Sequence, residues 1–102
     1  MPMFEQDLER NAANHVPLSP VSFLARSARI YPNRVAVIHG ERHFTYAQFL
    51  ERSRRLASSL TRAGVGKGDT VAIMAPNTPQ MLEAHYAVPM LGAVLCPINI
   101  RL

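Results

Sequence analysis

Apolar residues recur at three- and four-residue spacing in two stretches of the first two thirds of the chain, which is the spacing of one face of a helix. In the first stretch the residues of a single apolar stripe are Val21, Leu24, Ala25 and Ala28. Ser19 precedes the stripe as a capping residue, and Pro32 cannot continue a helix. The pattern predicts a helix over residues 20–31.

The second stretch carries the clearest local signal in the chain. Thr45 and Gln48 have the spacing of a capping box, in which each side chain hydrogen-bonds the backbone N–H of the other residue. Phe44 and Phe49 stand at the positions of a hydrophobic staple, and Gly64 supplies a left-handed C-terminal cap. We predict a long amphipathic helix between these signals. Its apolar face consists of Tyr46, Phe49, Leu50, Leu56, Ala57, Leu60 and Ala63.

A β-branched run lies between the two predicted helices, over residues 34–39. Gly40 follows it, and glycine at the first central position of a two-residue loop is what a type II′ hairpin turn requires. The sequence therefore predicts a short antiparallel hairpin. Its cross-strand pairs are His39 with Arg42 and Ile38 with His43.

The last third of the chain reads as strand, helix, strand. Apolar strands are predicted at residues 70–74 and 93–98, and the helix between them opens at Thr78-Pro79 and closes at Gly92. Its second half is apolar on nearly all sides, which favours burial, and Pro89 predicts a kink or an early end. Continuous apolar strands around a helix are typical of a parallel βαβ unit with buried strands.

These elements predict the α/β class: a partial three-layer domain with an N-terminal helix, a β-hairpin, a long amphipathic helix and one parallel βαβ unit. The sheet is incomplete, because parallel strands normally need further strands and cover on both faces. Residues 18–102 are expected to form the folded part. Residues 1–17 are expected to form a flexible tail with a short helical turn at 4–11, acidic through Glu5, Asp7 and Glu9.

The amino-acid composition indicates the general class of protein but does not identify a function. A chain of 102 residues with 48% apolar residues is typical of a single globular domain, and a net charge of +4 is too small to indicate nucleic-acid binding by itself. No stretch has the roughly 20 apolar residues of a membrane span, and the acidic start is unlike a secretory signal. The one cysteine, Cys96, lies in an apolar stretch and is expected to be a buried, inert thiol in a reducing, cytoplasmic setting.

A glycine-rich loop and a pair of histidines resemble a phosphate-binding site and a metal site, but their positions in the predicted elements argue against both. The glycines of Gly64-x-Gly66-x-Gly68 follow a helix and precede a strand, which reverses the order of a phosphate-binding P-loop, so we interpret them as a plain turn. His39 and His43 would project to opposite faces of the hairpin and could not chelate a metal together. We expect His85 to be partly buried and hydrogen-bonded rather than catalytic, and His15 lies in the predicted tail.

Arginines make the hairpin and the long helix basic, which leaves nucleic-acid binding open as a weak hypothesis against the alternative of a solvated helix face. Glu51 precedes Arg55 by four residues, the favourable order for an ion pair on a helix. No residue is assigned a catalytic, cofactor-binding or metal-binding role. The arginines of this surface are Arg42, Arg52, Arg54, Arg55 and Arg62.

Five blocks in unbroken order resemble the N-terminal region of the adenylate-forming, or AMP-binding, enzymes, which include acyl-CoA synthetases, amino-acid adenylation domains and luciferases. The ending PINIRL is more similar to the acid–CoA ligase branch than to the peptide-synthetase branch. The blocks are residues 32–36 (PNRVA), 44–49 (FTYAQF), 64–73 (GVGKGDTVAI), 76–80 (PNTPQ) and 91–102 (LGAVLCPINIRL).

The resemblance implies an N-terminal fragment of an ATP-dependent ligase for fatty or medium-chain acids, truncated within the AMP-binding domain. Such an enzyme forms an acyl-adenylate and then acyl-CoA, using ATP, Mg and CoA. The family's phosphate loop, nucleotide motifs and catalytic lysine do not occur in this chain, so no residue inherits their roles and the fragment is expected to be inactive alone. Its expected partner is the remainder of the ligase polypeptide. The alternative is a stand-alone interaction module or the complement of a split enzyme.

Overall fold

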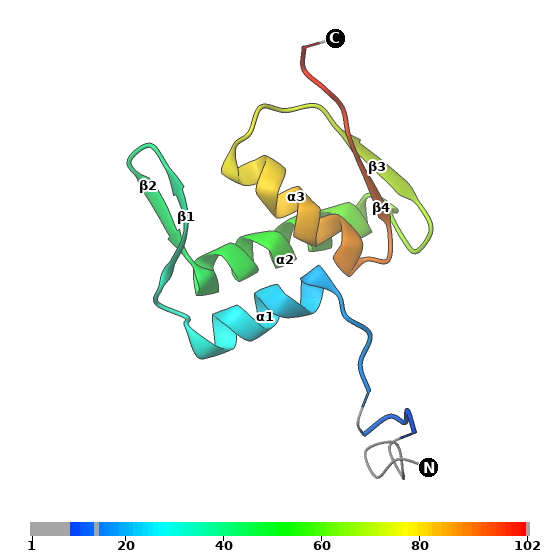
Figure 1. Ribbon diagram of the computed structural model, residues 1–102. Coiled ribbons are helices and arrows are strands. Elements are labelled where there is room, and N and C mark those ends of the chain that lie inside the picture. The colour runs from blue at the N-terminus through cyan, green and yellow to red at the C-terminus, as the bar shows by residue number, and fades with distance from the viewer. Residues whose placement is uncertain (1–8, 14, 102) are drawn as a thin grey trace.

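Local sequence signals set the boundaries of most elements in the protein, whose computed structural model describes residues 9–13 and 15–101. The elements in chain order are α1 (Pro20–Ile30), β1 (Val35–His39), β2 (Arg42–Thr45), α2 (Tyr46–Arg62), β3 (Thr70–Ile73), α3 (Pro79–Met90) and β4 (Val94–Pro97). The α2 helix lies between α1 and α3, with the β1–β2 hairpin at one end of the helices and the β3–β4 pair at the other (Figure 1). The predicted α/β class, with two separate small sheets and no closed sheet, is confirmed.

The first two helices begin as predicted. The Ser19 hydroxyl accepts a hydrogen bond from the Val21 N–H at 3.3 Å. At α2 the capping box is complete: Gln48 N–H donates to Thr45 Oγ1 at 3.2 Å, and Thr45 N–H donates to Gln48 Oε1 at 2.8 Å. Gly64 then adopts a φ of +97°, the left-handed conformation that ends a helix at low cost only for glycine.

The hairpin also has the predicted register, with His39 opposite Arg42 and Ile38 opposite His43. Gly40 has a φ of +61°, as the tight turn requires. An irregularity between Val35 and Val37 shifts the register at the start of β1.

The hairpin packs onto the helices through a small core of Leu24, Val37 and Phe49. The Phe49 ring meets the Tyr86 ring of α3 edge to face, with centroids 5.4 Å apart. Phe44 also packs against this core, so both staple residues contribute to it. One cluster therefore joins α1, the hairpin, α2 and α3.

The βαβ unit is confirmed, since β3 and β4 pair in parallel with Thr70 opposite Val94 and Ile73 opposite Pro97. The helix between them ends at Met90, one residue after Pro89, which confirms the predicted early end. The helix starts at Pro79, as predicted. Thr78 precedes the helix but makes no side-chain capping bond; its hydroxyl instead faces the Pro76 carbonyl oxygen at 3.4 Å.

Four burial predictions were wrong: those for the β3 and β4 strands, for Cys96, for Ala63 and for His85. The strands of the βαβ unit are largely exposed, because α3 is the main element that packs on them. Cys96 in β4 is therefore an exposed free thiol rather than a buried one. Ala63, the C-cap residue of α2, is exposed too.

The described part of the predicted tail, residues 9–13 and 15–17, contains no helix or strand. Most of the helical turn expected at residues 4–11 lies outside the described residues. Among the described residues, no helix combines the length and apolar character that crossing a membrane demands.

Candidate functional site

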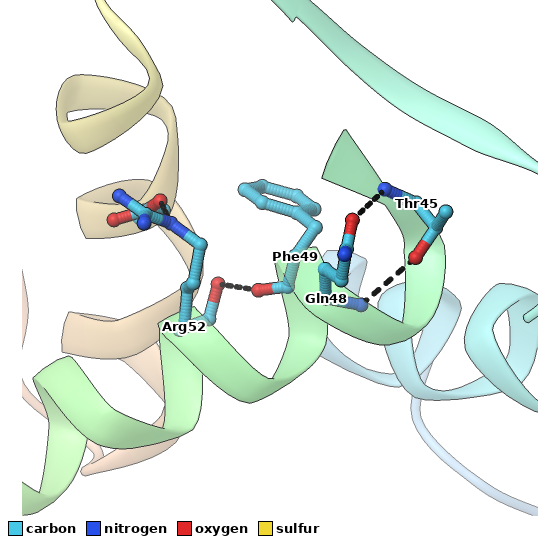
Figure 2. Close-up of polar contacts among 6 residues, drawn as sticks. Thr45, Gln48, Phe49 and Arg52 are labelled. Carbon is cyan, nitrogen blue, oxygen red and sulfur yellow. Dashed lines mark hydrogen bonds and ion pairs between the residues drawn. The ribbon is translucent and has the colours of Figure 1, made fainter. Parts of the chain in front are cut away.

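Among the described residues, Glu83 on α3 is the one buried charged residue, with 5% of its surface exposed. Arg52 of α2 donates from Nε to Glu83 Oε1. The capping box starts the helix that carries Arg52 two turns later (Figure 2). A buried carboxylate without a cationic partner is strongly destabilising, so this ion pair ties α2 to α3.

Arg52 also connects the pair to the hairpin. Its guanidinium lies 4.5 Å from the centroid of the Phe44 ring, a distance at which a cation is attracted to an aromatic face. The sequence analysis grouped Arg52 with solvated arginines and missed Glu83 as its partner. The two residues are 31 positions apart, and no helical spacing connects them. The contact ties α2 to α3 across the core.

The remaining arginines of the predicted basic surface do not act alike. Arg55 binds Glu51 at 2.6 Å, which confirms the predicted ion pair. Arg42 lies 5.0 Å from the centroid of the Phe44 ring. Arg54 and Arg62 line a groove between α1 and α2. The hypothesis that all five arginines lie on one solvated basic face was therefore wrong for Arg52. It holds for only some of the other arginines.

Hydrogen bonds to Asp69 and to the turn after α3 fix the Gly64–Gly68 loop. The Gly66 N–H donates to the Asp69 carboxylate at 2.7 Å, and the Gly68 N–H donates to the Gly92 carbonyl at 3.0 Å. A Cβ at Gly92 would lie 3.2 Å from Cγ of Lys67, so the loop and the turn after α3 pack closely. These contacts give the loop a role in joining α2 to β3.

The histidines occupy separate surroundings. His39 and His43 are exposed, and the hairpin register puts them at consecutive, oppositely directed positions of the ladder. His15 is exposed in the segment before α1. His85 is exposed rather than partly buried, but its Nδ1 lies 2.8 Å from the Met81 carbonyl oxygen, as expected for a hydrogen-bonded ring.

One grouping was not predicted: His39 and His85 line the same groove of about 370 Å³ between β1 and α3, together with Asn77 and Thr78. The hairpin and α3 bring them there from distant parts of the sequence. No group of three or more potential metal ligands occurs within residues 9–13 and 15–101.

The uncovered β3–β4 pair is a candidate interaction surface. Val94 and Cys96 are exposed at alternate positions of β4, and Leu95 between them is partly buried. Met74 and Ile100, which follow the two strands, are 61% and 52% exposed. Strands with free edges and an apolar exposed side pair readily with further polypeptide. These exposed apolar side chains make this end of the molecule a candidate interface.

Comparison with known proteins identifies the family. A family model described as "AMP-binding enzyme" matches residues 24–102. Over 96 residues the chain is 52% identical to an acetate–CoA ligase of Humulus lupulus, and it is equally similar to a peroxisomal benzoate–CoA ligase of Arabidopsis thaliana. Each match covers 94% of this chain and 17% of the relative, so the chain spans about a sixth of the length of these proteins.

Solved structures agree with this result. The N-terminal subdomain of Klebsiella oxytoca NpsA matches with a TM-score of 0.77 and 30% identity, over 81% of this chain and 22% of that one. A fatty acyl CoA synthetase of Mycobacterium tuberculosis matches with a TM-score of 0.77 and 36% identity, over 80% and 17% of the two chains. The incomplete α/β architecture is thus shared with the N-terminal part of much longer proteins. The chain belongs to the AMP-binding, adenylate-forming enzyme family, in its acyl-CoA ligase branch.

Proposed function

We propose that residues 18–102 form the N-terminal part of the adenylate-forming domain of an ATP-dependent acid–CoA ligase, preceded by a flexible tail at residues 1–17. The observation that supports this most directly is the uncovered β3–β4 pair in a chain that matches a sixth of its relatives' length. The partner of that surface is the remainder of the ligase polypeptide. In this proposal the chain supplies a folded support for the domain and no catalytic group.

The reaction of the complete enzyme follows from the family. A carboxylate oxygen attacks the α-phosphorus of ATP, which forms the acyl-adenylate and releases pyrophosphate; the CoA sulfur then attacks the acyl carbon and AMP leaves. ATP, Mg and CoA belong to this complete enzyme, and we assign no residue of the present chain to them. We propose a fatty or medium-chain acid as substrate. A structural relative named fatty acyl CoA synthetase supports this class, whereas the acids in the names of other relatives, acetate, butyrate and benzoate, are short-chain or aromatic.

A complementation assay tests the proposal. The chain would be combined with the remainder of the hop acetate–CoA ligase, and acid-dependent exchange of pyrophosphate into ATP would be measured. We expect exchange from the mixture and none from either part alone. Val94→Asp, on the exposed side of β4, should abolish it, whereas Gln80→Asp, on an exposed position of α3, should not. Exchange by the chain alone would contradict the proposal.

The second candidate is a stand-alone interaction module, or the complement of a split enzyme, which the same exposed strand edges favour. Amide hydrogen exchange separates it from the first. A module should show strong protection in β3, β4 and α2 when alone, with no further gain when the ligase remainder is added. A ligase segment should gain protection in β3 and β4 only on assembly.

We also propose a cytosolic location, which suits a free, exposed thiol, and no nucleic-acid partner. Some relatives are named as peroxisomal enzymes. Recovery of the protein in a peroxisomal fraction would therefore contradict the cytosolic location. Retention on DNA that falls steeply with salt would contradict the absence of a nucleic-acid partner.

A further inference from the structure

Both strands of the β3–β4 pair have a free edge, because the described residues add no third strand to this sheet. The hydrogen bonds between the two strands show which backbone groups are already used. The Val94 N–H donates to the Asp69 carbonyl oxygen at 2.7 Å, and the Ile98 N–H donates to the Ile73 carbonyl oxygen at 2.8 Å. Because the backbone groups of successive residues in a strand point to opposite sides, every second residue directs its N–H to a free edge.

The free edge of β3 is better suited to accept another strand than that of β4. The register directs the N–H groups of Thr70 and Ala72 to the free edge of β3. At the free edge of β4 the corresponding positions are Leu95 and Pro97, and proline has no N–H to donate. A strand that pairs with β3 therefore meets an unbroken row of donors, which β4 does not provide.

The two faces of the pair also differ. The side chains of Val71, Ile73 and Leu95 are partly buried and alternate with exposed ones, which puts them on the face that α3 covers (Figure 1). The opposite face is exposed and consists of small or apolar side chains, as expected of a sheet face that a helix covers. Its residues are Thr70, Ala72, Val94 and Cys96.

We propose that the next helix and strand of the ligase polypeptide complete this pair, and that the new strand lies parallel to β3 at its free edge. The inference rests on the proposed function, which supplies the partner polypeptide. It names the edge that the partner takes and the face that it covers.

The handedness of strand–helix–strand connections links the edge to the face. Such connections are right-handed in nearly all proteins. The unit β3–α3–β4 runs from β3 to β4 with its helix on one face. A connection of the same hand that runs from β4 back past β3 places its helix on the opposite face, which is the exposed one. A strand beside β4 would instead place the helix on the side of α3 and leave the exposed face open.

Amide hydrogen exchange resolved to single residues tests the proposal in a fusion of the full chain to the remainder of the hop acetate–CoA ligase. We expect the Thr70 and Ala72 amides to exchange at least about 100-fold more slowly in the fusion than in the isolated chain, because each gains a hydrogen bond. The Leu95 amide should change by less than about threefold. Protection of Leu95 without Thr70 and Ala72 would overturn the proposal. Protection in the isolated chain that rises with its concentration would also overturn it, because two copies would then pair at this edge.

A proline variant makes the test specific to the β3 edge. Ala72→Pro removes one donor of that edge, whereas Ala72→Ser keeps the N–H with a side chain of similar size. In the fusion, Ala72→Pro should lower acid-dependent exchange of pyrophosphate into ATP at least about tenfold, and Ala72→Ser less than about twofold. Circular dichroism of the isolated chain should be the same for both variants, since no described strand pairs with this N–H.

The two readouts separate this inference from the proposed function. Equal activity of the two Ala72 variants in the fusion would overturn the inference, as would an active fusion in which Leu95 alone is protected. A fusion that protects Thr70 and Ala72 but exchanges no pyrophosphate would overturn the proposed function and leave the strand placement supported.

Discussion

The helix–hairpin region, residues 19–62, and the βαβ region, residues 70–97, are stabilised in different ways. In the first, side chains cap both helices and the core of Leu24, Val37 and Phe49 joins three elements. In the second, Thr78 makes no side-chain cap bond and both strands are largely exposed. Its buried residues lie mainly on α3, which packs against α2. The comparison shows that the first region supplies its own support, whereas the second is held to it by one helix and leaves a surface uncovered.

The largest expected effect comes from removing the aromatic centre of the helix–hairpin core. Phe49→Ala should lower the free energy of unfolding by about 3–5 kcal/mol, because the ring is buried and contacts Tyr86. Urea denaturation followed by circular dichroism measures the change. Phe23→Ala, at a side chain 45% exposed, is the control and should cost less than about 1 kcal/mol. Equal losses would show that the core does not lie where the structure has it.

The next effect concerns the ion pair that joins the two regions. Arg52→Ala leaves the buried Glu83 carboxylate without its partner and should cost about 2–4 kcal/mol. Arg55→Ala, which removes the exposed pair with Glu51, should cost less than about 0.5 kcal/mol. The double variant Arg52→Met with Glu83→Leu should recover most of the loss, since it removes both charges. A double variant as unstable as Arg52→Ala would refute the ion-pair explanation.

A smaller effect distinguishes the helix starts of the two regions. Thr45→Ala removes a hydroxyl that accepts the Gln48 N–H at 3.2 Å and should cost about 1 kcal/mol. Thr78→Ala removes a hydroxyl that makes no capping bond and should change the free energy of unfolding by less than about 0.5 kcal/mol. Chemical denaturation of both variants makes a matched comparison. Equal costs would indicate that Thr78 caps α3 after all.

The smallest effect on stability tests the uncovered surface. Cys96→Ser should change the free energy of unfolding by less than about 0.5 kcal/mol, because the side chain is exposed. The wild-type thiol should react with a chromogenic disulfide as fast as a model thiol in the isolated chain. Assembly with the rest of the proposed ligase should slow that reaction at least about tenfold. A slow reaction in the isolated chain would mean that β4 is already covered.

Sequence reasoning succeeded where a residue's partner lies within about four positions. The capping box, the Glu51–Arg55 pair, the hairpin register and the end of α3 after Pro89 all depend on such short-range relations. It failed at Arg52 and Cys96. Nothing near Arg52 in the sequence reveals that it reaches Glu83, and the apolar neighbours of Cys96 indicate a buried strand without saying whether anything covers it.

By itself, the sequence determined the order and type of the elements, the incompleteness of the sheet and, through its five blocks, the enzyme family. These follow from backbone preferences and local hydrogen bonds, which depend on adjacent residues. Only the tertiary structure decided which charge is buried, which strand surface stays exposed, and that Arg54 and Arg62 face a groove with α1. Burial and charge pairing depend on contacts between segments far apart in the chain, and helical or strand periodicity shows which face is apolar but not which segment covers it.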